Sequence, residues 1–276
     1  MSVQGPLLLV GCGKMGGALL RGWLAGGLSP QETIVVEPQE AGRTALAGLG
    51  VTVLADPGGL SPDFAPRTVV LAVKPQQMEA MLPAYRRLVR PGTFFLSIAA
   101  GKTIGYLERH LGAGTAAGAA IVRAMPNTPA AVGRGISVAC ANAHATAAQR
   151  AAATALLAAA GEVAWVEDEG LIDAVTAVSG GGPAYVFLLI ECLAKAGAAS
   201  GLPEDLAMRL ARVTVSGSGE LARLSDEPAA VLRQNVTSPG GTTLEALKIL
   251  MAPDGLEPLL VKAIAAATRR SRELAD

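Results

Sequence analysis

The sequence predicts an α/β protein in two parts: an N-terminal doubly wound domain of the Rossmann type and a C-terminal domain made only of helices. Short apolar runs alternate with helical patterns as far as about residue 166. The first apolar run is followed by a glycine-rich turn, and beyond residue 166 only long helical patterns remain. Continuous Val/Ile/Leu runs with intervening helices are typical of a parallel sheet covered on both faces. We place the first domain at residues 1–167 and the second at 168–276.

Eight segments of the first part are expected as strands, because each is short, apolar and bounded by turn residues. They are Leu7–Val10, Thr33–Glu37, Val51–Leu54, Thr68–Val73, Thr93–Ile98, Ala120–Met125, Ile136–Cys140 and Val163–Val166. Helical patterns between them include residues 76–88 and 145–160. Right-handed crossovers between parallel neighbours then give a doubly wound sheet.

The second part carries helical periodicity throughout. The expected helices are Leu171–Val178, Ala184–Ala199, Pro203–Leu224, Thr242–Met251 and Leu256–Leu274. Pro203 stands at a helix start and Gly201 just outside a helix end, where each residue type is favoured. This half is therefore expected to be an all-helical domain.

Composition excludes several classes of protein. The 276 residues carry 23 basic and 23 acidic side chains, and charged residues make up only 17% of the chain. A chain without a basic stripe or an acidic tail is expected to have no nucleic-acid partner. Hydrophobic residues reach 51% while aromatic ones are 3%, so the apolar surface is mostly Ala, Val and Leu. This balance favours closely packed helices and a large subunit interface.

No metal site is expected. Cys12, Cys140 and Cys192 are scattered, and no pair has the spacing of metal ligands. His110 and His144 lie on separate predicted surface elements. The cysteines are interpreted as reduced, buried thiols of a cytoplasmic protein.

No membrane span or signal peptide is expected either. The first apolar run is too short and lacks a basic flank. The longest apolar helical pattern, from Pro183 to Leu193, is shorter than a membrane span and contains Glu191.

The glycine-rich turn predicts a dinucleotide site. It follows a strand and precedes a helical pattern, which is the context of the G-x-G-x-x-G fingerprint. Gly11 allows the turn, Gly13 lets a pyrophosphate approach the backbone, and Gly16 lets helix and strand pack closely. The alternative is an ordinary strand–helix turn. The expected cofactor-binding residues here are Gly11, Cys12, Gly13, Lys14, Met15 and Gly16.

Glu37 is the candidate for reading the cofactor's ribose. It ends the second expected strand, 21 residues after Gly16. A carboxylate there can accept hydrogen bonds from the 2′-hydroxyl, which favours NADH over NADPH. The alternative is a strand end that faces solvent, since Pro38 follows. Arg43 is near enough in sequence to meet a 2′-phosphate, so the preference between NADH and NADPH stays open.

Three further strand ends are expected around the cofactor, because ligands of open α/β sheets bind at the carboxyl ends of strands. Small side chains at Ala99 and Ala100 leave room for a flat nicotinamide ring, and Asn127 is the polar edge of a proline-fixed turn. Lys74 could instead be the solvated end of a strand, and Asn127 could belong to a turn that is rigid but has no part in binding. The residues concerned are Ala72, Val73, Lys74, Pro75, Ala99, Ala100 and Asn127.

A second glycine-rich loop precedes the helical pattern that starts at Thr242. A Gly-Gly pair before a helix N-terminus exposes backbone N–H groups at the positive end of the helix dipole, which suits a carboxylate. Neighbouring hydroxyls can orient what the carboxylate is attached to. The candidate substrate-binding residues are Ser238, Gly240, Gly241, Thr242 and Thr243.

Five motifs together resemble the pyrroline-5-carboxylate reductase family, over essentially the whole chain. They are Gly11-Cys12-Gly13-Lys14-Met15-Gly16, Ala72-Val73-Lys74-Pro75, Arg123-Ala124-Met125-Pro126-Asn127-Thr128-Pro129, Ser179 to Tyr185, and Val236-Thr237-Ser238-Pro239-Gly240-Gly241-Thr242-Thr243. The last motif is the most specific.

The resemblance implies an NAD(P)H-dependent oxidoreductase that reduces the C=N bond of 1-pyrroline-5-carboxylate to L-proline, the last step of proline biosynthesis. It implies a homodimer with interleaved helical domains, often assembled into a larger ring. It also implies that the loop from Ser238 to Thr242 holds the substrate carboxylate. The hydroxyl of Thr243 would hydrogen-bond the imine nitrogen and is the catalytic candidate.

Two departures from the family pattern matter. Many relatives have serine where this chain has Gly181, so a side-chain contact from that position is not carried over. Many bacterial relatives end the second strand with Asn-Arg where this chain has Glu37-Pro38, so their NADPH preference is not carried over.

Two other functions compete with this one. Another imine reductase or a β-hydroxyacid dehydrogenase would have a similar architecture. It would carry a catalytic lysine in the helical half, for which Lys195 and Lys248 are the candidates. A non-catalytic NAD(P)-binding protein would not require the intact loop from Ser238 to Thr243.

Overall fold

An eight-stranded sheet organises the first part of the chain, in the order β3-β2-β1-β4-β5-β6-β7-β8. The computed structural model describes residues 5–112 and 118–275. The strands are β1 Leu7–Val10, β2 Thr33–Val36, β3 Thr52–Leu54, β4 Thr68–Leu71, β5 Phe94–Ser97, β6 Ala120–Met125, β7 Gly135–Ala141 and β8 Gly161–Trp165. Strand order reverses direction at β1, which is paired with both β2 and β4. This is the doubly wound arrangement that the sequence predicted.

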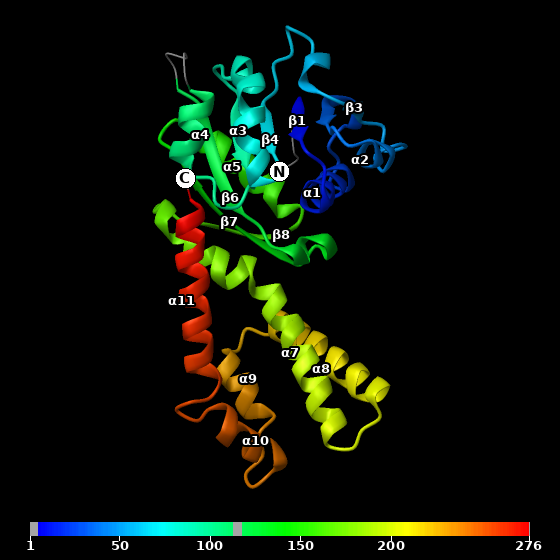
Figure 1. Ribbon diagram of the computed structural model, residues 1–276. Coiled ribbons are helices and arrows are strands. Elements are labelled where there is room, and N and C mark those ends of the chain that lie inside the picture. Colours follow the sequence, from blue (N-terminus) through cyan, green and yellow to red (C-terminus); the bar gives the residue numbers. More distant parts are fainter. Residues whose placement is uncertain (1–4, 113–117, 276) are drawn as a thin grey trace. The chain divides into compact units, whose positions relative to one another are not determined.

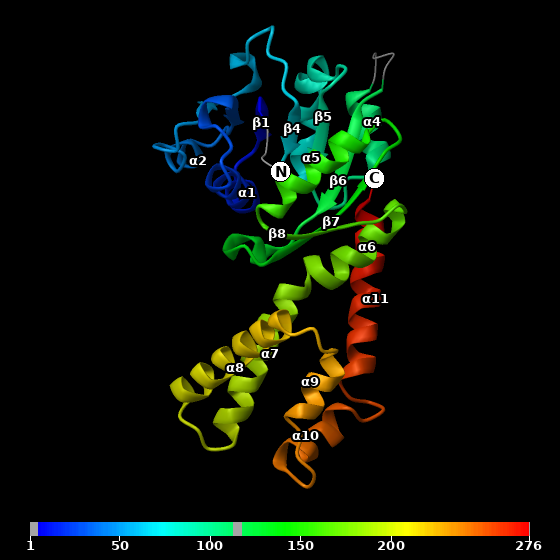
Figure 2. The ribbon, with the colours of Figure 1, turned by 180° about the vertical axis from the view of Figure 1, so that it is seen from behind.

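Alternate residues of each central strand supply the two faces of the sheet. Leu8 and Val10 of β1 pack in one core cluster and Leu7 and Leu9 in the other, as the two-residue period of a strand requires. Figure 1 shows the first face, covered by α3 (Met78–Met81) and α4 (Ile104–Leu111), and Figure 2 shows α5 on the opposite face.

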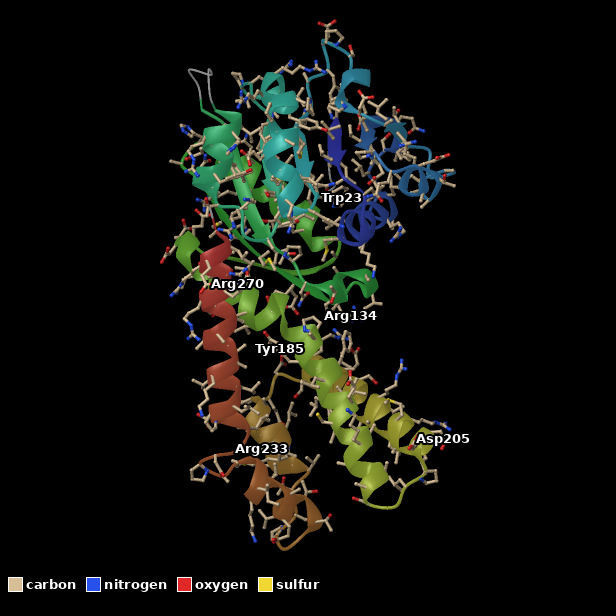
Figure 3. The ribbon with its side chains drawn as sticks, in the orientation of Figure 1. Trp23, Arg134, Tyr185, Asp205, Arg233 and Arg270 are labelled. Atoms are coloured by element: carbon tan, nitrogen blue, oxygen red, sulfur yellow. The ribbon has the colours of Figure 1, made fainter. Side chains whose placement is uncertain are left out.

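A tryptophan side chain connects two helices on this second face by a hydrogen bond. They are α1 (Lys14–Ala25) and α5 (Ala147–Ala158). Trp23 lies on α1 (Figure 3) and is fully buried. Its indole Nε1 donates a hydrogen bond to the carbonyl oxygen of Leu156 on α5, at 2.7 Å. The small helix α2 (Glu40–Thr44) follows β2.

Two features of the sheet domain differ from expectation. β7 runs antiparallel to β6, because the chain between them is too short for the crossover that a parallel neighbour needs. The segment expected as one helix over residues 76–88 is α-helical only at α3, between 3₁₀ turns at Pro75–Gln77 and Leu82–Leu88. Pro83 explains this, since proline lacks the N–H that would continue the α-helical ladder.

The second part of the chain is helical. Its elements are α6 Ile172–Val175, a π-helical turn at Thr176–Gly180, α7 Gly182–Ala199, α8 Glu204–Leu224, α9 Ala229–Asn235, α10 Thr242–Leu250 and α11 Leu256–Leu274. The short helix α9 was not predicted. α7 and α8 pack closely, since a Cβ atom on Gly197 would meet that of Ala207 at 3.3 Å.

The chain divides into two compact units. Residues 181–266 form one, and residues 1–180 together with 267–276 form the other. The C-terminal end of α11 is fixed in the sheet unit, because the Ser271 hydroxyl donates a 2.7 Å hydrogen bond to the Asp173 carboxylate. The domain boundary expected at residues 167–168 stays a prediction.

Candidate active site

The carboxyl ends of the strands form the candidate cofactor edge of the sheet unit. The chain leaves β1 at Gly11, β2 at Glu37 and β4 at Ala72, and these three strands are neighbours. The reversal of strand order at β1 is the topological switch point at which open α/β sheets bind dinucleotides.

The three fingerprint glycines have three different surroundings. Gly11 has φ +83°, and a Cβ atom there would lie 2.8 Å from Val73 Cγ1. A Cβ on Gly16 would lie 2.7 Å from the Gly11 carbonyl oxygen, so this glycine allows α1 to pack against the turn. A Cβ on Gly13 would meet nothing within 4 Å. The turn is therefore packed on its inner side and open at Gly13, as a cradle for a pyrophosphate requires.

The start of α1 is also suited to an anion. Gly13 is its N-cap and makes no side-chain cap, and the first turn contains no acidic residue. The first N–H groups of a helix have no partner within the helix, and they lie at the positive end of its dipole. These groups and the open cradle fit a dinucleotide phosphate.

Glu37 lies directly after β2 and is only 7% exposed. Its Oε2 accepts a hydrogen bond from the Cys12 backbone N–H at 2.8 Å, and its Oε1 accepts one from the Gln39 N–H at 2.9 Å. Gly42 makes room for the side chain, since a Cβ there would lie 2.6 Å from Glu37 Cγ. The carboxylate thus joins the end of β2 to the glycine turn, which the sequence did not reveal.

Arg43 is bound to the same strand end. Its Nη1 donates to the carbonyl oxygens of Pro38 at 2.6 Å and Glu37 at 3.2 Å. A guanidinium has five N–H donors, so it can keep these bonds and still meet another acceptor.

The other predicted cofactor residues lie at neighbouring strand ends. Ala72 and Val73 follow β4 directly and pack on Gly11 and Gly16. Lys74 is exposed and precedes the 3₁₀ turn that starts at Pro75. Beyond β5, Ala99 is buried and Ala100 is exposed. The sheet thus brings Lys14, Met15 and these residues to one edge.

Asn127 is held in place by its side-chain oxygen. Asn127 Oδ1 accepts a hydrogen bond from the Ile136 backbone N–H at 2.9 Å, across the turn between β6 and β7. The amide can still donate two hydrogen bonds from its nitrogen. This turn is therefore both rigid and able to supply a polar edge.

The predicted substrate loop lies in the helical unit and starts α10. Gly240 has φ +70°, which favours glycine, and Gly241 is the N-cap of α10 without a side-chain cap. A Cβ on Gly241 would lie 2.5 Å from the Ser238 hydroxyl oxygen, so the loop is closely folded on itself. Thr242 and Thr243 form the exposed first turn of the helix. Their backbone N–H groups and hydroxyls form the candidate carboxylate site.

Lys248, a candidate base in the competing dehydrogenase function, is ion-paired. Its Nζ lies 2.6 Å from the Glu245 carboxylate one turn earlier on α10, and both side chains are mostly exposed. Such an environment is that of a solvated surface pair.

Two thiols of the sheet unit have raised pKa values. Burial, and next the negative charge of Glu37, raise the pKa of the Cys12 thiol from 9.0 to about 11. Burial first, and then Glu169, raise the pKa of Cys140 to about 11. Both thiols are protonated and unreactive at neutral pH. Cys192 on α7 is exposed in the single chain, so the expectation of three buried thiols was wrong for this residue.

An ion pair between a buried arginine and a partly exposed glutamate was not anticipated. Arg123 on β6 is 3% exposed, and its Nη1 lies 2.6 Å from Glu169 Oε1. The same oxygen accepts the Ile104 N–H at 2.8 Å. The arginine was visible in the sequence as a charge within an apolar strand, but its partner is 46 residues away.

Two family models match the chain. The model described as pyrroline-5-carboxylate reductase dimerisation matches residues 169–274. The model described as NADP oxidoreductase, coenzyme F420-dependent, matches residues 7–101.

Relatives and solved structures resemble the chain over nearly its whole length. The pyrroline-5-carboxylate reductase of Pseudomonas aeruginosa is 40% identical, over 98% of this chain and 97% of the relative. That of Synechocystis is 39% identical over 99% of both chains. The structure of the Coxiella burnetii pyrroline-5-carboxylate reductase superposes with a TM-score of 0.90, at 33% identity and over 99% of each chain. A Plasmodium falciparum pyrroline carboxylate reductase with NADP bound gives 0.80 at 29% identity, over 98% of each chain.

The fold and the glycine turn define a nicotinamide-dependent oxidoreductase with a Rossmann-type domain and a helical dimerisation domain. Its relatives identify the family within this class. The chain belongs to the pyrroline-5-carboxylate reductase family.

Dimerisation accounts for the apolar surface of the helical unit. Large side chains on α7 and α8, among them Phe187, Leu210 and Val213, are about half exposed or more in the single chain. Exposed apolar patches of this extent mark interaction sites. One helical run, Glu169–Ala199, is long and apolar enough by length and composition to cross a membrane, which corrects the shorter span expected from sequence. The same run falls within the dimerisation model.

Proposed function

We propose that this protein reduces the C=N bond of 1-pyrroline-5-carboxylate to L-proline, as the last step of proline biosynthesis. The observation that carries the proposal is the loop from Ser238 to Thr243, which ends in an uncapped helix N-terminus with two adjacent hydroxyls. Relatives with up to 40% identity bear the name of this reductase.

The loop supplies binding and orientation. The backbone N–H groups at Gly240 and Thr242, with the Ser238 hydroxyl, hold the substrate carboxylate at the positive end of α10, while the Gly241 N–H donates to the Ser238 carbonyl oxygen and closes the loop. The Thr243 hydroxyl orients the imine nitrogen and keeps its proton in place, which makes the C=N carbon more electrophilic. When bound, the reduced nicotinamide supplies the hydride that the carbon accepts. Fixed orientation of the two reactants is the main contribution of the protein.

The sheet unit holds the cofactor at the glycine turn and the strand ends already described. We infer a preference for NADH over NADPH, because the Glu37 carboxylate would repel a 2′-phosphate and can accept from the ribose 2′-hydroxyl. Arg43 opposes this preference, since its guanidinium lies at the same strand end and attracts a phosphate.

The protein is a homo-oligomer through its helical domain. We infer a homodimer as the basic assembly, with a ring of dimers as the larger one, in the cytoplasm and without nucleic-acid or membrane partners. In such a dimer the apolar faces of α7 and α8 are buried against the partner subunit.

The test is the decay of absorbance of NADH and of NADPH, in parallel, with purified protein and 1-pyrroline-5-carboxylate. Substrate-dependent decay of NADH at the higher kcat/KM is expected. Equal or faster decay of NADPH would contradict the NADH preference alone. No decay with either cofactor, from protein that binds NADH, would contradict the reductase function and favour the non-catalytic alternative.

A further inference from the structure

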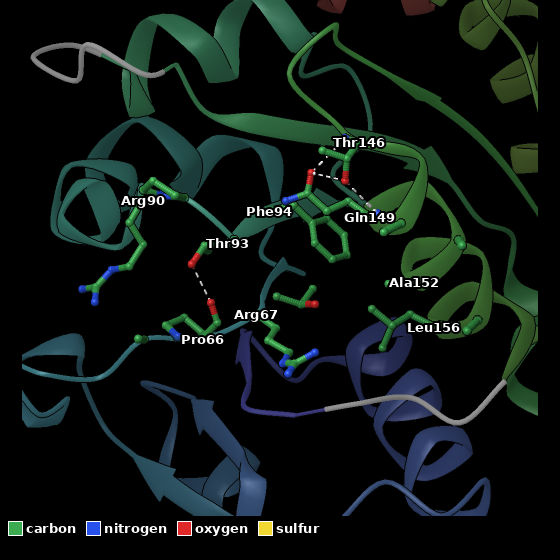
Figure 4. Close-up of a pocket in the computed structure, with 16 residues that line it drawn as sticks. Pro66, Arg67, Arg90, Thr93, Phe94, Thr146, Gln149, Ala152 and Leu156 are labelled. Atoms are coloured by element: carbon green, nitrogen blue, oxygen red, sulfur yellow. Dashed lines mark hydrogen bonds between the residues drawn. The ribbon is translucent and has the colours of Figure 1, made fainter.

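A second cleft lies at the amino ends of β4 and β5 (Figure 4). Its volume is about 930 Å³, within the range of small-molecule sites. The floor consists of side chains that are at most 5% exposed: Thr68, Thr93, Phe94 and Leu156. Residues of α5, among them Ala152, form one wall. The cleft lies entirely within the sheet unit.

This cleft is separate from the cofactor edge. Gly11, Glu37 and Asn127 lie at carboxyl ends of strands, whereas Thr68 and Phe94 are the first residues of β4 and β5. All neighbours from β1 to β6 run parallel, so the two ends of these strands lie at opposite edges of the sheet. A ligand in the cleft would therefore occupy a second site and would not extend the first.

The charge of the cleft points to an anion. Among the described residues that line it, the ionisable side chains are Arg67 and Arg90, from the segments that lead into β4 and β5. Arg90 is half-buried, and its Nη2 lies 3.4 Å from the Arg87 carbonyl oxygen. Each guanidinium has five donors in a planar fork that matches carboxylate or phosphate, so it can keep such contacts and still bind an anion.

Among the other polar side chains of the lining are Thr93, beside Pro66, and Thr146 and Gln149 at the start of α5 (Figure 4). The Thr93 hydroxyl donates to the Pro66 carbonyl oxygen at 2.6 Å. Gln149 Oε1 accepts the Thr146 N–H at 2.9 Å, so its amide nitrogen is the end that can donate to a ligand. The rest of the lining is mostly alanine methyl groups and aliphatic carbon. An inorganic ion alone would leave this apolar surface exposed to water, whereas a ligand with an apolar part would cover it.

We propose that this cleft is a second binding site, for a small organic anion with a phosphate or carboxylate head and an apolar body. Arg67 binds the head, and Arg90, whose guanidinium points away from that of Arg67, lies at another part of the cleft (Figure 4). The alanine wall of α5 contacts the body. The proposal does not depend on the reaction catalysed at the other edge of the sheet.

Calorimetric titration with three probes tests the composition of the ligand: phenyl phosphate, inorganic phosphate and phenol. The titrations use the full-length oligomer in saturating NADH, so that the cofactor edge is occupied. We expect phenyl phosphate to bind with a Kd below about 1 mM and at least about tenfold more tightly than either other probe. Inorganic phosphate binding as tightly as phenyl phosphate would overturn the role of the apolar wall.

Variants locate the site. Arg67→Gln should weaken phenyl phosphate binding at least about tenfold, because it removes the charged donor that binds the head, and Arg90→Gln should weaken it less. Ala152→Leu should weaken binding by narrowing the cleft beside the α5 wall, at an exposed helix position where leucine is tolerated. Arg109→Gln, an exposed arginine on α4 that does not line the cleft, is the matched control and should bind normally. Unchanged binding in Arg67→Gln, or no binding to the wild type at about 10 mM, would overturn the proposal.

Discussion

The Glu37 carboxylate accepts a hydrogen bond from the Cys12 backbone N–H, with 2.8 Å between Glu37 Oε2 and the Cys12 nitrogen. Cys12 lies between the first two fingerprint glycines, and Glu37 ends the neighbouring strand. The residue expected to read the ribose therefore also fixes the turn that receives the pyrophosphate. In the proposed cofactor site, a change at Glu37 would therefore affect both cofactor choice and cofactor affinity.

Replacing Glu37 separates its two roles. Glu37→Ala should raise KM by about tenfold or more for both NADH and NADPH, because a hydrogen bond to a charged acceptor contributes about 1.5–3 kcal/mol. Glu37→Gln keeps an oxygen that can accept the Cys12 N–H, and it removes the negative charge. It should raise KM for NADH and lower it for NADPH. Steady-state kinetics with both cofactors measure these KM values. Identical KM values in the two variants would contradict the role of the Glu37–Cys12 hydrogen bond in fixing the glycine turn.

The glycine turn offers a matched pair of substitutions. Gly13→Ala should leave the melting temperature within about 2 °C of the wild type, because its methyl group meets no protein atom within 4 Å, and should weaken NADH binding. Gly16→Ala should lower the melting temperature, since its methyl group would lie 2.7 Å from the Gly11 carbonyl oxygen. Calorimetry and NADH titration of both proteins test the pair. Normal NADH affinity in Gly13→Ala would contradict the cradle.

The pH dependence of Cys12 reactivity reports how close its thiol lies to the Glu37 carboxylate. In a Cys140→Ala/Cys192→Ala protein, Cys12 should react with iodoacetamide about 100-fold more slowly at pH 8 than a thiol of pKa 9.0, because its pKa is raised to about 11. The rate should rise as pH approaches 11, where the thiolate forms. Glu37→Gln should speed the reaction, since it removes the second cause of the raised pKa. A rate profile with its midpoint near pH 9 would show that the thiol is neither buried nor close to Glu37.

Thr243 provides the test of the substrate loop. Thr243→Val keeps the shape of the side chain and removes the hydroxyl, so kcat should fall by about 10- to 100-fold, the cost of one hydrogen bond to a charged group. The dissociation constant for NADH should not change. Thr243→Ser should recover most of the activity. Wild-type turnover in Thr243→Val would remove the hydroxyl from the mechanism.

Local patterns made the strand–turn–helix unit at residues 7–25 predictable. β1 is a run of four apolar residues, and the turn that follows requires glycine at Gly11, where φ is +83°. Burial of β1 on both faces was also foreseeable from its unbroken apolar composition. These features depend only on residues that are close in sequence.

Features that depend on distant residues could not be predicted. The Cys12–Glu37 hydrogen bond joins residues 25 apart, and the Arg123–Glu169 pair joins residues 46 apart. Two other errors had local causes that the sequence does contain: Pro83 interrupts the helical pattern over residues 76–88, and the connection before β7 is too short for a crossover. Each of these depends on backbone geometry that periodicity does not describe.

Transfer of deuterium is the most direct test of the reductase function. The protein is mixed with 1-pyrroline-5-carboxylate and NADH that carries deuterium at both positions of C4, and the product is analysed by mass spectrometry. L-Proline with one deuterium on its δ carbon, the former imine carbon, is the expected product. Loss of NADH without labelled proline, or the absence of proline from protein that binds NADH, would contradict the proposed function.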